Sequence, residues 1–587
     1  MEGLLLTLSL SLSDINTHTH THTNILTLTH RYEGTGRSLS LKLMKSIRTQ
    51  SVSSSETDPS PSVGLSSTGR VLREISLTEP IRYASGDAVE RWLNDLLCLD
   101  ASIPPSVKST CPHPSACELF HVSRDTLFSC HRTSERFLHH MMALYVSSHY
   151  KNTPNDLMLM SDAPLHHLFV LLAPVDPSAG PSKAIPEILT VLQVCLEGGI
   201  AKQTVQAELG SGKRPAGDLI PWTIAQQYQD YDFASLSGAR VVRIATHPSY
   251  QGMGYGTRAL ALLEDYYAGK IFSVTEEEED SADGERAGDS AKKSNEEEGD
   301  LSSETIAPRT HLPPLLQSLH ERRPDPIHWL GVSFGLTPPL CKFWGAAGYV
   351  PLYVRLTSND VTGEHTCIML KTIAHKGDLL SAEGAVDPDR KWLSSFSADF
   401  RCRFLSLLSF EFRRFPPSLA LRILQQCGDS VDADSDSQYG KPLSASDLHS
   451  LLSTYDIRRL DSYARNLLDY HVVLDIVPQL ARLHFQKRFG SVSLSHVQAA
   501  ILAAVGLQHK TVDEAAVELA LQPNQVCVCV CCLRCGLFAY FFSLIILSLF
   551  YCLSCDFKIV FLLSTHFNAI LYDNSHPSLS PSHSPRC

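Results

Sequence analysis

Two hydrophobic patterns, one typical of strands and one typical of helices, alternate through the middle of the chain. After this part, the helical pattern predominates. Short runs rich in apolar and β-branched residues, which predict buried strands, occupy 168–172, 240–246, 327–334, 348–355 and 366–371. Apolar positions three or four residues apart predict a helix over 258–267, with Leu260, Leu263 and Tyr267 on one face. From 387 to 521 the helical spacing predominates. An α/β part followed by a mainly helical part is therefore expected.

A glycine-containing loop joins the predicted strand over 240–246 to the predicted helix. It reads Gln251-x-x-Gly254-x-Gly256. Glycines let the backbone approach a ligand closely, and the free amides at a helix N-terminus favour an anion such as pyrophosphate. A Rossmann loop would need Gly-x-Gly-x-x-Gly, and Thr257 stands where its last glycine would be. The pattern predicts a loop that binds the diphosphate of another cofactor.

The order of this loop resembles the coenzyme A loop of the GNAT acetyltransferase superfamily. The resemblance implies an α/β fold with a GNAT-type mixed sheet and helices on both faces, over about 106–375. In that fold the strand before the loop splays from its neighbour and its amides hold the pantetheine arm. The acetyl-CoA site implied here consists of Ile244, Ala245, Thr246, Gln251, Gly252, Met253, Gly254, Tyr255, Gly256 and Thr257.

Longer segments are similar to the eukaryotic RNA cytidine acetyltransferases, relatives of the bacterial tRNA(Met) cytidine acetyltransferase. These segments are 33–43, 92–100, 148–156, 217–222, 330–338 and 356–365. The resemblance implies that 31–105 is a remnant of a helicase-like domain with a Ser-rich linker. It also implies a helical RNA (tRNA)-binding domain over 385–525. ATP is a cofactor of the full-length family, and we expect its site to lie outside this chain.

Acetyl transfer to N4 of cytidine, in small-subunit rRNA and in tRNA, is the activity that the family resemblance implies. It further implies a role in ribosome biogenesis in the nucleus and nucleolus. The expected partners are a tRNA adaptor protein, ribosome-assembly factors and a second copy of the chain. We expect no metal and no membrane. Ala346 replaces a usually basic residue that contacts coenzyme A phosphates in the family, so weaker cofactor binding is expected.

Cytidine is a weak nucleophile because its exocyclic amine is delocalised into the ring, so the reaction calls for a general base. The family match assigns the catalytic role to His149 and Tyr150. Without that match, a single histidine after a helix is more often structural. His166 and His167 are weaker alternatives, expected to be one packed and one exposed residue at the start of a strand.

Two other functions fit the sequence. The same cofactor loop would serve a protein lysine or amine acetyltransferase, and a truncated, inactive chain would bind RNA or assembly partners only. The helical part interleaves basic and aromatic residues, namely Arg401, Arg403, Arg413, Arg414, Phe400, Phe404, Phe410, Phe412 and Phe415. Their spacing alone favours aromatics packed in a core, whereas the family match favours contact with RNA.

Composition changes this interpretation only in an acidic segment and at the two ends. The formal charge is −12, but 276–300 holds twelve acidic and three basic residues and so accounts for −9. We expect a disordered acidic insertion over 275–305, and the charge does not exclude RNA. The repeats at 17–23 and 527–531 resemble translated dinucleotide repeats. We therefore expect 1–30 and the apolar tail 526–587 to come from non-coding sequence.

Overall fold

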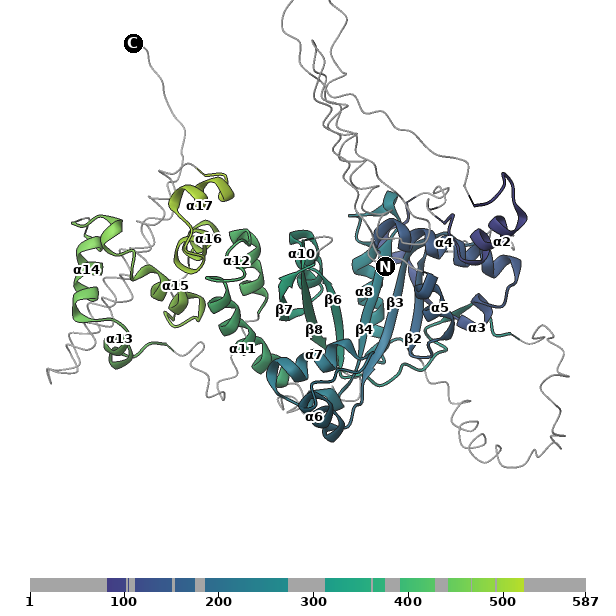
Figure 1. Cartoon of the computed structure of the whole chain (residues 1–587), viewed down its shortest axis with the longest axis horizontal. Coiled ribbons are helices and arrows are strands. Elements are labelled where there is room, and N and C mark those ends of the chain that lie inside the picture. The colour runs from purple at the N-terminus through teal and green to yellow at the C-terminus, as the bar shows by residue number, and fades with distance from the viewer. Residues whose placement is uncertain are drawn as a thin grey trace, which may run out of the picture. The chain divides into compact units, whose positions relative to one another are not determined.

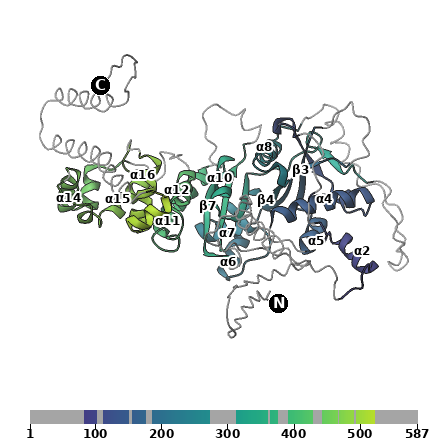
Figure 2. The ribbon, with the colours of Figure 1, turned by 90° about the horizontal axis from the view of Figure 1, so that it is seen from above.

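The computed structural model describes residues 82–101, 104, 111–149, 154–174, 185–272, 312–359, 363–374, 391–427, 442–465, 467–490 and 494–521. It divides into two compact units, Met1–Ser397 and Ala398–Cys587 (Figures 1 and 2). Tyr150 and the predicted segments 1–30, 275–305 and 526–587 lie outside the described residues.

The first unit is built on one sheet of eight strands in the order β5-β1-β2-β3-β4-β6-β8-β7. The strands are β1 Glu118–Val122, β2 His166–Leu172, β3 Ile188–Gly198, β4 Ser237–Thr246, β5 Leu316–Ser318, β6 Trp329–Gly335, β7 Val350–Ser358 and β8 His365–Thr372. Only β4 and β6 pair in parallel, and every other described pair is antiparallel. The sheet is therefore mixed, as the sequence predicts.

Helices cover both faces of this sheet. Leu168 and Val170 of β2 belong to the apolar cluster that α4 (Arg132–Ser148) completes. The intervening Phe169 points the other way, because side chains alternate along a strand. Its ring lies 5.9 Å from that of Tyr266 in α8 (Tyr255–Tyr267). Figures 1 and 2 show α4 and α8 beside the same strands.

Shorter helices precede the strands of the first unit or connect them. They are α2 Ala88–Leu96, η1 Pro114–Ala116, α3 Arg124–Leu127, α5 Pro154–Asp162, α6 Lys202–Gly210, α7 Leu219–Tyr228, η3 Phe233–Ser235, η4 Pro248–Tyr250 and α10 Pro338–Ala346. Helix α7 packs with Trp329, Ile368 and Leu370 of the sheet in a second apolar cluster. Within the described ranges no helix is long and apolar enough to cross a bilayer, and no group of side chains is placed to hold a metal ion.

The described part of the second unit is helical. Its elements are the end of α11 (Lys391–Leu407), α12 Pro417–Gln426, α13 Ala445–Leu451, α14 Thr454–Ala464, η9 Tyr470–Val472, α15 Val477–Phe485, α16 His496–Leu502, η10 Ala503–Leu507 and α17 Val512–Leu519. Four of these helices begin with a capping box, in which Ser444, Ser453, Ser495 or Thr511 exchanges hydrogen bonds with the residue three positions on. These local signals fix where the helices start.

The aromatic residues of the second unit are mostly in its core. Phe400, Phe404, Phe412 and Phe415 are buried, whereas Phe410 is 72% exposed. The core position that the spacing alone favours therefore holds for four of the five phenylalanines. Arg401 is buried as well, so these residues do not form the continuous basic and aromatic surface for RNA that the family match favours.

Candidate active site

Strand β4 extends beyond one of its two partners. Its pairing with β6 ends at Val241, opposite Val332, whereas its pairing with β3 continues to Thr246. Beyond Val332, strand β6 still pairs with β8 on its other side. The two central strands therefore part. Among the described residues, Ile244, Ala245 and Thr246 have a strand partner on one side only.

A β-bulge lies where the strands begin to part. Gln193 of β3 pairs with Arg243, and the next residue of β3, Val194, pairs with Val241. Val242 is therefore an extra residue in β4. A bulge of this kind increases the local twist and redirects the strand, and bulges are frequent beside active sites. It provides a local reason why β4 leaves β6 at this point.

The three glycines of the loop after β4 serve different purposes. Gly252 has φ +79° and Gly254 has φ +91°, in the left-handed region that L residues with a side chain rarely adopt. Gly256 lies in the first turn of α8. A Cβ at Gly256 would stand 3.4 Å from Thr246 Oγ1 and 3.5 Å from Phe343 Cζ. The third glycine thus keeps a side chain out of the space between β4, α8 and α10.

Helix α8 presents free amides at its start. Gly254 is its N-cap and makes no side-chain cap, and the first bond within the helix runs from the Arg258 amide to the Gly254 carbonyl, at 2.9 Å. The amides of the first three helical residues therefore have no partner within the helix. The loop before them is exposed at Gln251, Gly252, Met253 and Gly254. An anion placed here would meet these amides and the positive end of the helix dipole.

Tyr255 anchors this helix start to the segment before β1. Its side chain is buried, and its hydroxyl group donates a hydrogen bond to the carbonyl oxygen of Pro112. The same hydroxyl oxygen lies 3.1 Å from Cys111 Sγ. Arg258 adds a hydrogen bond from Nη2 to the Ser115 carbonyl oxygen, at 3.3 Å. These contacts fix the direction of the helix axis and hence of its free amides.

His149 lies at the open end of β4. It is the C-cap of α4, and its Nε2 is 3.2 Å from the carbonyl oxygen of Ile244. Because a carbonyl oxygen only accepts, this bond requires the proton on Nε2, and the lone pair of the neutral ring is then on Nδ1. The structure therefore brings His149 to the predicted cofactor strand. The position of Tyr150 is outside the described residues.

A buried cation supports this arrangement, and sequence reasoning did not single it out. Arg243 is 9% exposed, and its Nη2 lies 2.8 Å from Asp156 Oδ1 of α5. Its guanidinium carbon is 5.8 Å from the centre of the Tyr145 ring in α4. Arg243 thus links both helices to β4, one residue before Ile244. The sequence signal for this role was an arginine between apolar residues of a predicted strand. A buried arginine requires a partner.

His166 and His167 lie away from the open end of β4. The register places His166 beside Cys195, which pairs with Arg240 near the start of that strand. His167 is buried and His166 is half-buried, so neither is exposed in the way the sequence suggested. Burial lowers the pKa of each ring to about 4, with further lowering by Arg240 for His166. Both histidines are neutral structural residues at physiological pH.

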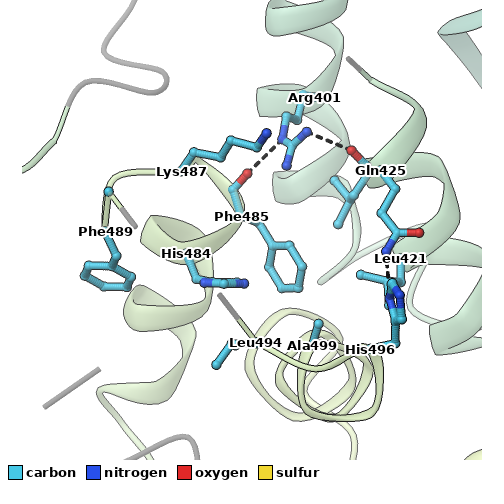
Figure 3. A pocket seen from close by; sticks show the side chains of 12 residues that line it. Arg401, Leu421, Gln425, His484, Phe485, Lys487, Phe489, Leu494, His496 and Ala499 are labelled. Atoms are coloured by element: carbon cyan, nitrogen blue, oxygen red, sulfur yellow. Dashed lines mark hydrogen bonds between the residues drawn. The ribbon is translucent and has the colours of Figure 1, made fainter. Parts of the chain in front are cut away.

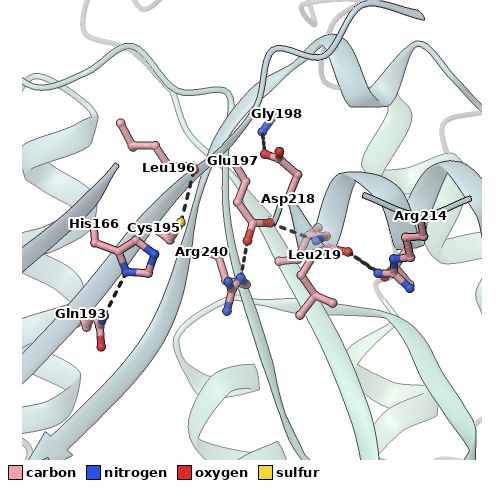
Figure 4. Close-up of polar contacts among 12 residues, drawn as sticks. His166, Gln193, Cys195, Leu196, Glu197, Gly198, Arg214, Asp218, Leu219 and Arg240 are labelled. Carbon is pink, nitrogen blue, oxygen red and sulfur yellow. Dashed lines mark hydrogen bonds and ion pairs between the residues drawn. The ribbon is translucent and has the colours of Figure 1, made fainter. Parts of the chain in front are cut away.

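A buried ion pair fixes the start of β4 (Figure 4). Glu197 of β3 is fully buried and pairs with the Nε of Arg240. Its second oxygen accepts a hydrogen bond from the amide of Ile220, at 3.0 Å, in the first turn of α7. Asp218 accepts from the Gly198 amide at 2.9 Å. This network holds β3, β4 and α7 together at the end of the sheet opposite to the glycine loop.

Three family models match the chain. Residues 140–374 match the model described as GNAT acetyltransferase 2, and residues 392–534 match "Possible tRNA binding domain". Residues 8–100 match the helicase domain of RNA cytidine acetyltransferase NAT10/TcmA. The parted strands, the glycine loop and the first of these matches define a GNAT acetyltransferase domain.

Curated relatives show which family of GNAT acetyltransferases the chain is similar to. The RNA cytidine acetyltransferases of Dictyostelium discoideum, Homo sapiens and Saccharomyces cerevisiae are each 50% identical to the chain, over 473, 464 and 468 residues. Each alignment covers 78% of this chain, and it covers 44%, 43% and 43% of these relatives. The chain thus spans less than half the length of the curated relatives it matches. It belongs to the RNA cytidine acetyltransferase family.

Proposed function

We propose that this chain transfers the acetyl group of acetyl-CoA to N4 of cytidine in RNA. The observation that carries the proposal is the parting of β4 from β6 directly before the exposed glycine loop. The GNAT match supports acetyl transfer, and the names of the relatives support cytidine in RNA as the acceptor.

The residues at the end of β4 and the start of α8 fit acetyl-CoA. The open edge of β4 at Ile244, Ala245 and Thr246 would bind the amide groups of the pantetheine arm. The exposed loop and the free amides of α8 would bind the diphosphate, in space that a Cβ at Gly256 would occupy. The cofactor supplies the acyl group as a reactive thioester. We propose that Ala346, exposed at the end of α10, weakens phosphate binding relative to a basic residue.

His149 is the proposed general base. The hydrogen bond to Ile244 holds its ring beside the cofactor strand and keeps the proton on Nε2. Its Nδ1 would accept the proton that leaves N4 as the bond from N4 to the acetyl carbon forms, which lowers the barrier for this weak nucleophile. The C–S bond of the thioester would break in the same reaction, and coenzyme A would leave as its thiolate and take up a proton. Tyr150 is proposed as a second catalytic residue on the family match alone.

RNA would have to present the cytidine unstacked, because N4 is not accessible within a helix stack. We propose small-subunit rRNA and tRNA as substrates, and the match to a tRNA-binding model supports an RNA acceptor. We also propose that the protein acts in the nucleus and nucleolus during ribosome biogenesis. A tRNA adaptor protein, ribosome-assembly factors and a second copy of the chain are its proposed partners, and imaging and co-purification of the tagged protein would test them.

Acetyl transfer by the purified full chain tests the main proposal. The chain is incubated with acetyl-CoA carrying an isotopically labelled acetyl group and a tRNA transcript, and the RNA is digested to nucleosides for mass spectrometry. We expect labelled N4-acetylcytidine, and none from the heat-denatured chain. Label on a lysine peptide instead would establish a protein acetyltransferase. Binding of acetyl-CoA and RNA without product would establish an inactive binding protein.

A further inference from the structure

A pocket of about 320 Å³ lies within the second unit, between α11, α12, α15 and α16 (Figure 3). Its lining residues are Arg401, Leu421, Leu424, Gln425, His484, Phe485, Lys487, Phe489, Gly490, Leu494, His496 and Ala499. A volume of this size is at the lower end of the range found for small-molecule sites. The pocket lies outside the acetyltransferase domain, and none of its lining residues has a role in the proposed reaction.

The polar side of the pocket is basic. Arg401, His484, Lys487 and His496 all line it, and no acidic residue is among the described lining residues. Arg401 is 5% exposed and is held in place by two carbonyl oxygens, Phe485 with Nε and Leu424 with Nη1, each at 2.7 Å. A guanidinium group fixed in this way is suited to recognise a phosphate.

Burial and the charge of Arg401 both lower the pKa of two of the other basic groups. Burial lowers the pKa of Lys487, and Arg401 lowers it further. Burial and then Arg401 lower the pKa of His484 to about 4, so this ring is neutral at physiological pH. Figure 3 shows the Lys487 amine directed toward the Arg401 guanidinium group. Two cations held side by side repel each other, and both attract an anion that enters the pocket.

The backbone at Lys487 is strained. Its φ is +57°, in the left-handed region where glycine and asparagine are common and lysine is not. The residue follows the end of α15, and its amide donates to the His484 carbonyl oxygen at 2.9 Å. Such a conformation costs about 1 kcal/mol in a residue with a side chain. The chain therefore keeps a lysine in the pocket wall where glycine would be more stable.

The rest of the pocket is aromatic and apolar. The rings of His484 and Phe485 are 5.1 Å apart, and Leu421, Leu494 and Ala499 add apolar surface. His496 Nδ1 lies 3.2 Å from Gln425 Nε2, which orients that imidazole. If the Gln425 amide donates, the proton of neutral His496 is on Nε2, where it can donate to a phosphate oxygen.

We propose that this pocket binds one nucleotide of RNA, with its phosphate against Arg401 and Lys487 and its base against His484 and the apolar wall. The inference rests on the proposed function, in which RNA is the acceptor, and it gives the helical unit a specific contact with that RNA. The RNA nucleotide that enters the pocket would be unstacked from its neighbours, as recognition of single-stranded RNA requires.

Lys487→Gly in the full chain tests this proposal, with Arg482→Gln as the matched control. Both variants remove one positive charge from the same segment, but Arg482 is exposed and does not line the pocket. Binding of a tRNA transcript is measured over a range of salt concentrations. For Lys487→Gly we expect binding about tenfold weaker and a salt slope less steep by about one, as for a lost phosphate contact. The thermal unfolding temperature should not fall, because glycine relieves the strain.

Equilibrium dialysis with 5′-AMP and with adenosine supplies the second measurement. A pocket that takes free nucleotides would bind 5′-AMP but not adenosine, and Lys487→Gly would abolish that binding. A pocket that needs the RNA chain would show the tRNA effect without AMP binding. If the two variants bind tRNA equally well and neither compound binds, the proposal is wrong. That outcome leaves acetyl transfer by the unmodified chain intact, so the two failures are distinguishable.

Discussion

The Nε2 atom of His149 lies 3.2 Å from the carbonyl oxygen of Ile244 and so joins the end of α4 to the open end of β4. At this position the ladder to β6 has already ended. A side chain therefore satisfies a strand carbonyl that would otherwise need a neighbouring strand. This bond helps to hold the proposed base beside the proposed cofactor strand.

His149→Gln separates the two roles of this histidine. A glutamine amide can still donate to the Ile244 carbonyl, but it cannot accept a proton at neutral pH. We expect kcat for acetyl transfer to fall about a hundredfold, the lower end of what general bases contribute. The dissociation constant for acetyl-CoA should stay the same, as measured by calorimetry. Unchanged turnover in this variant would remove His149 from the mechanism.

Gly256→Ala tests the cofactor site without damaging the fold. Gly256 is helical, so alanine should raise the unfolding free energy by about 0.5–1 kcal/mol. Its Cβ would enter the space beside Thr246 and Phe343. We expect acetyl-CoA to bind about tenfold more weakly, as for a modest steric overlap.

Gly210→Ala is the matched control for this substitution. Gly210 ends α6, and a Cβ there would meet no atom within 4 Å. This variant should gain a similar helical preference and bind acetyl-CoA like the unmodified chain. If both variants bind the cofactor normally, the space beside Gly256 does not hold it.

The sequence predicted those features of the site that depend on local order along the chain. The predicted helix over 258–267 is α8, which begins three residues earlier at Tyr255, and the predicted strand over 240–246 is β4. The strand, loop and helix could be predicted because glycines and apolar spacing act on neighbouring residues. The contact of His149 with Ile244 could not, because it joins residues 95 positions apart. The family resemblance named His149, and only the fold shows what it touches.

The pocket in the helical unit could not be predicted from the sequence for the same reason. Its walls come from four helices, and no spacing in the sequence brings Arg401 close to Lys487. The spacing of the phenylalanines around Arg401 favoured a core and the family match favoured contact with RNA, and four of the five are buried. Which face of a helix is buried depends on the helices packed against it, and their arrangement is not encoded locally.

Asp156→Asn should destabilise the first unit. The substitution removes the negative charge 2.8 Å from the buried Arg243 guanidinium group and leaves that cation poorly compensated. We expect the unfolding free energy to fall by about 2 kcal/mol, less than for a fully buried pair because Asp156 is partly exposed. Asp162→Asn, an exposed change on the same helix, should have little effect. Equal stabilities of the two variants would show that the pair contributes nothing.

Tryptophan fluorescence is the appropriate measurement for these stability predictions. The chain has five tryptophans, and all of them precede Ala398, where the second unit begins. Denaturant unfolding followed by this signal therefore reports mainly on the first unit. Trp392 is the exception, because it lies on α11, which continues into the second unit.

The stability of the first unit should decrease in mild acid, and His121 and His167 are two of the histidines that contribute to this decrease. Burial lowers the pKa of His121 to about 3 and that of His167 to about 4, and Arg322 lowers both further. Gln317, through its bond to His121, and Asp325, beside His167, oppose this shift without cancelling it. In the unfolded chain each histidine has a pKa of about 6.5.

The sign of the effect follows from which state takes up protons first. As the pH falls below about 6.5, the unfolded chain binds protons that the folded unit does not, so the unfolding free energy decreases. This stabilisation is complete above about pH 6.5 and is lost progressively down to about pH 3–4, with a slope of at most about 1.4 kcal/mol per pH unit for each histidine. His121→Gln removes one such group and should make the pH dependence shallower. His320→Gln, an exposed change, should leave the slope as it is. A slope unaltered in His121→Gln would show that this histidine takes up its proton equally readily in the folded and unfolded states.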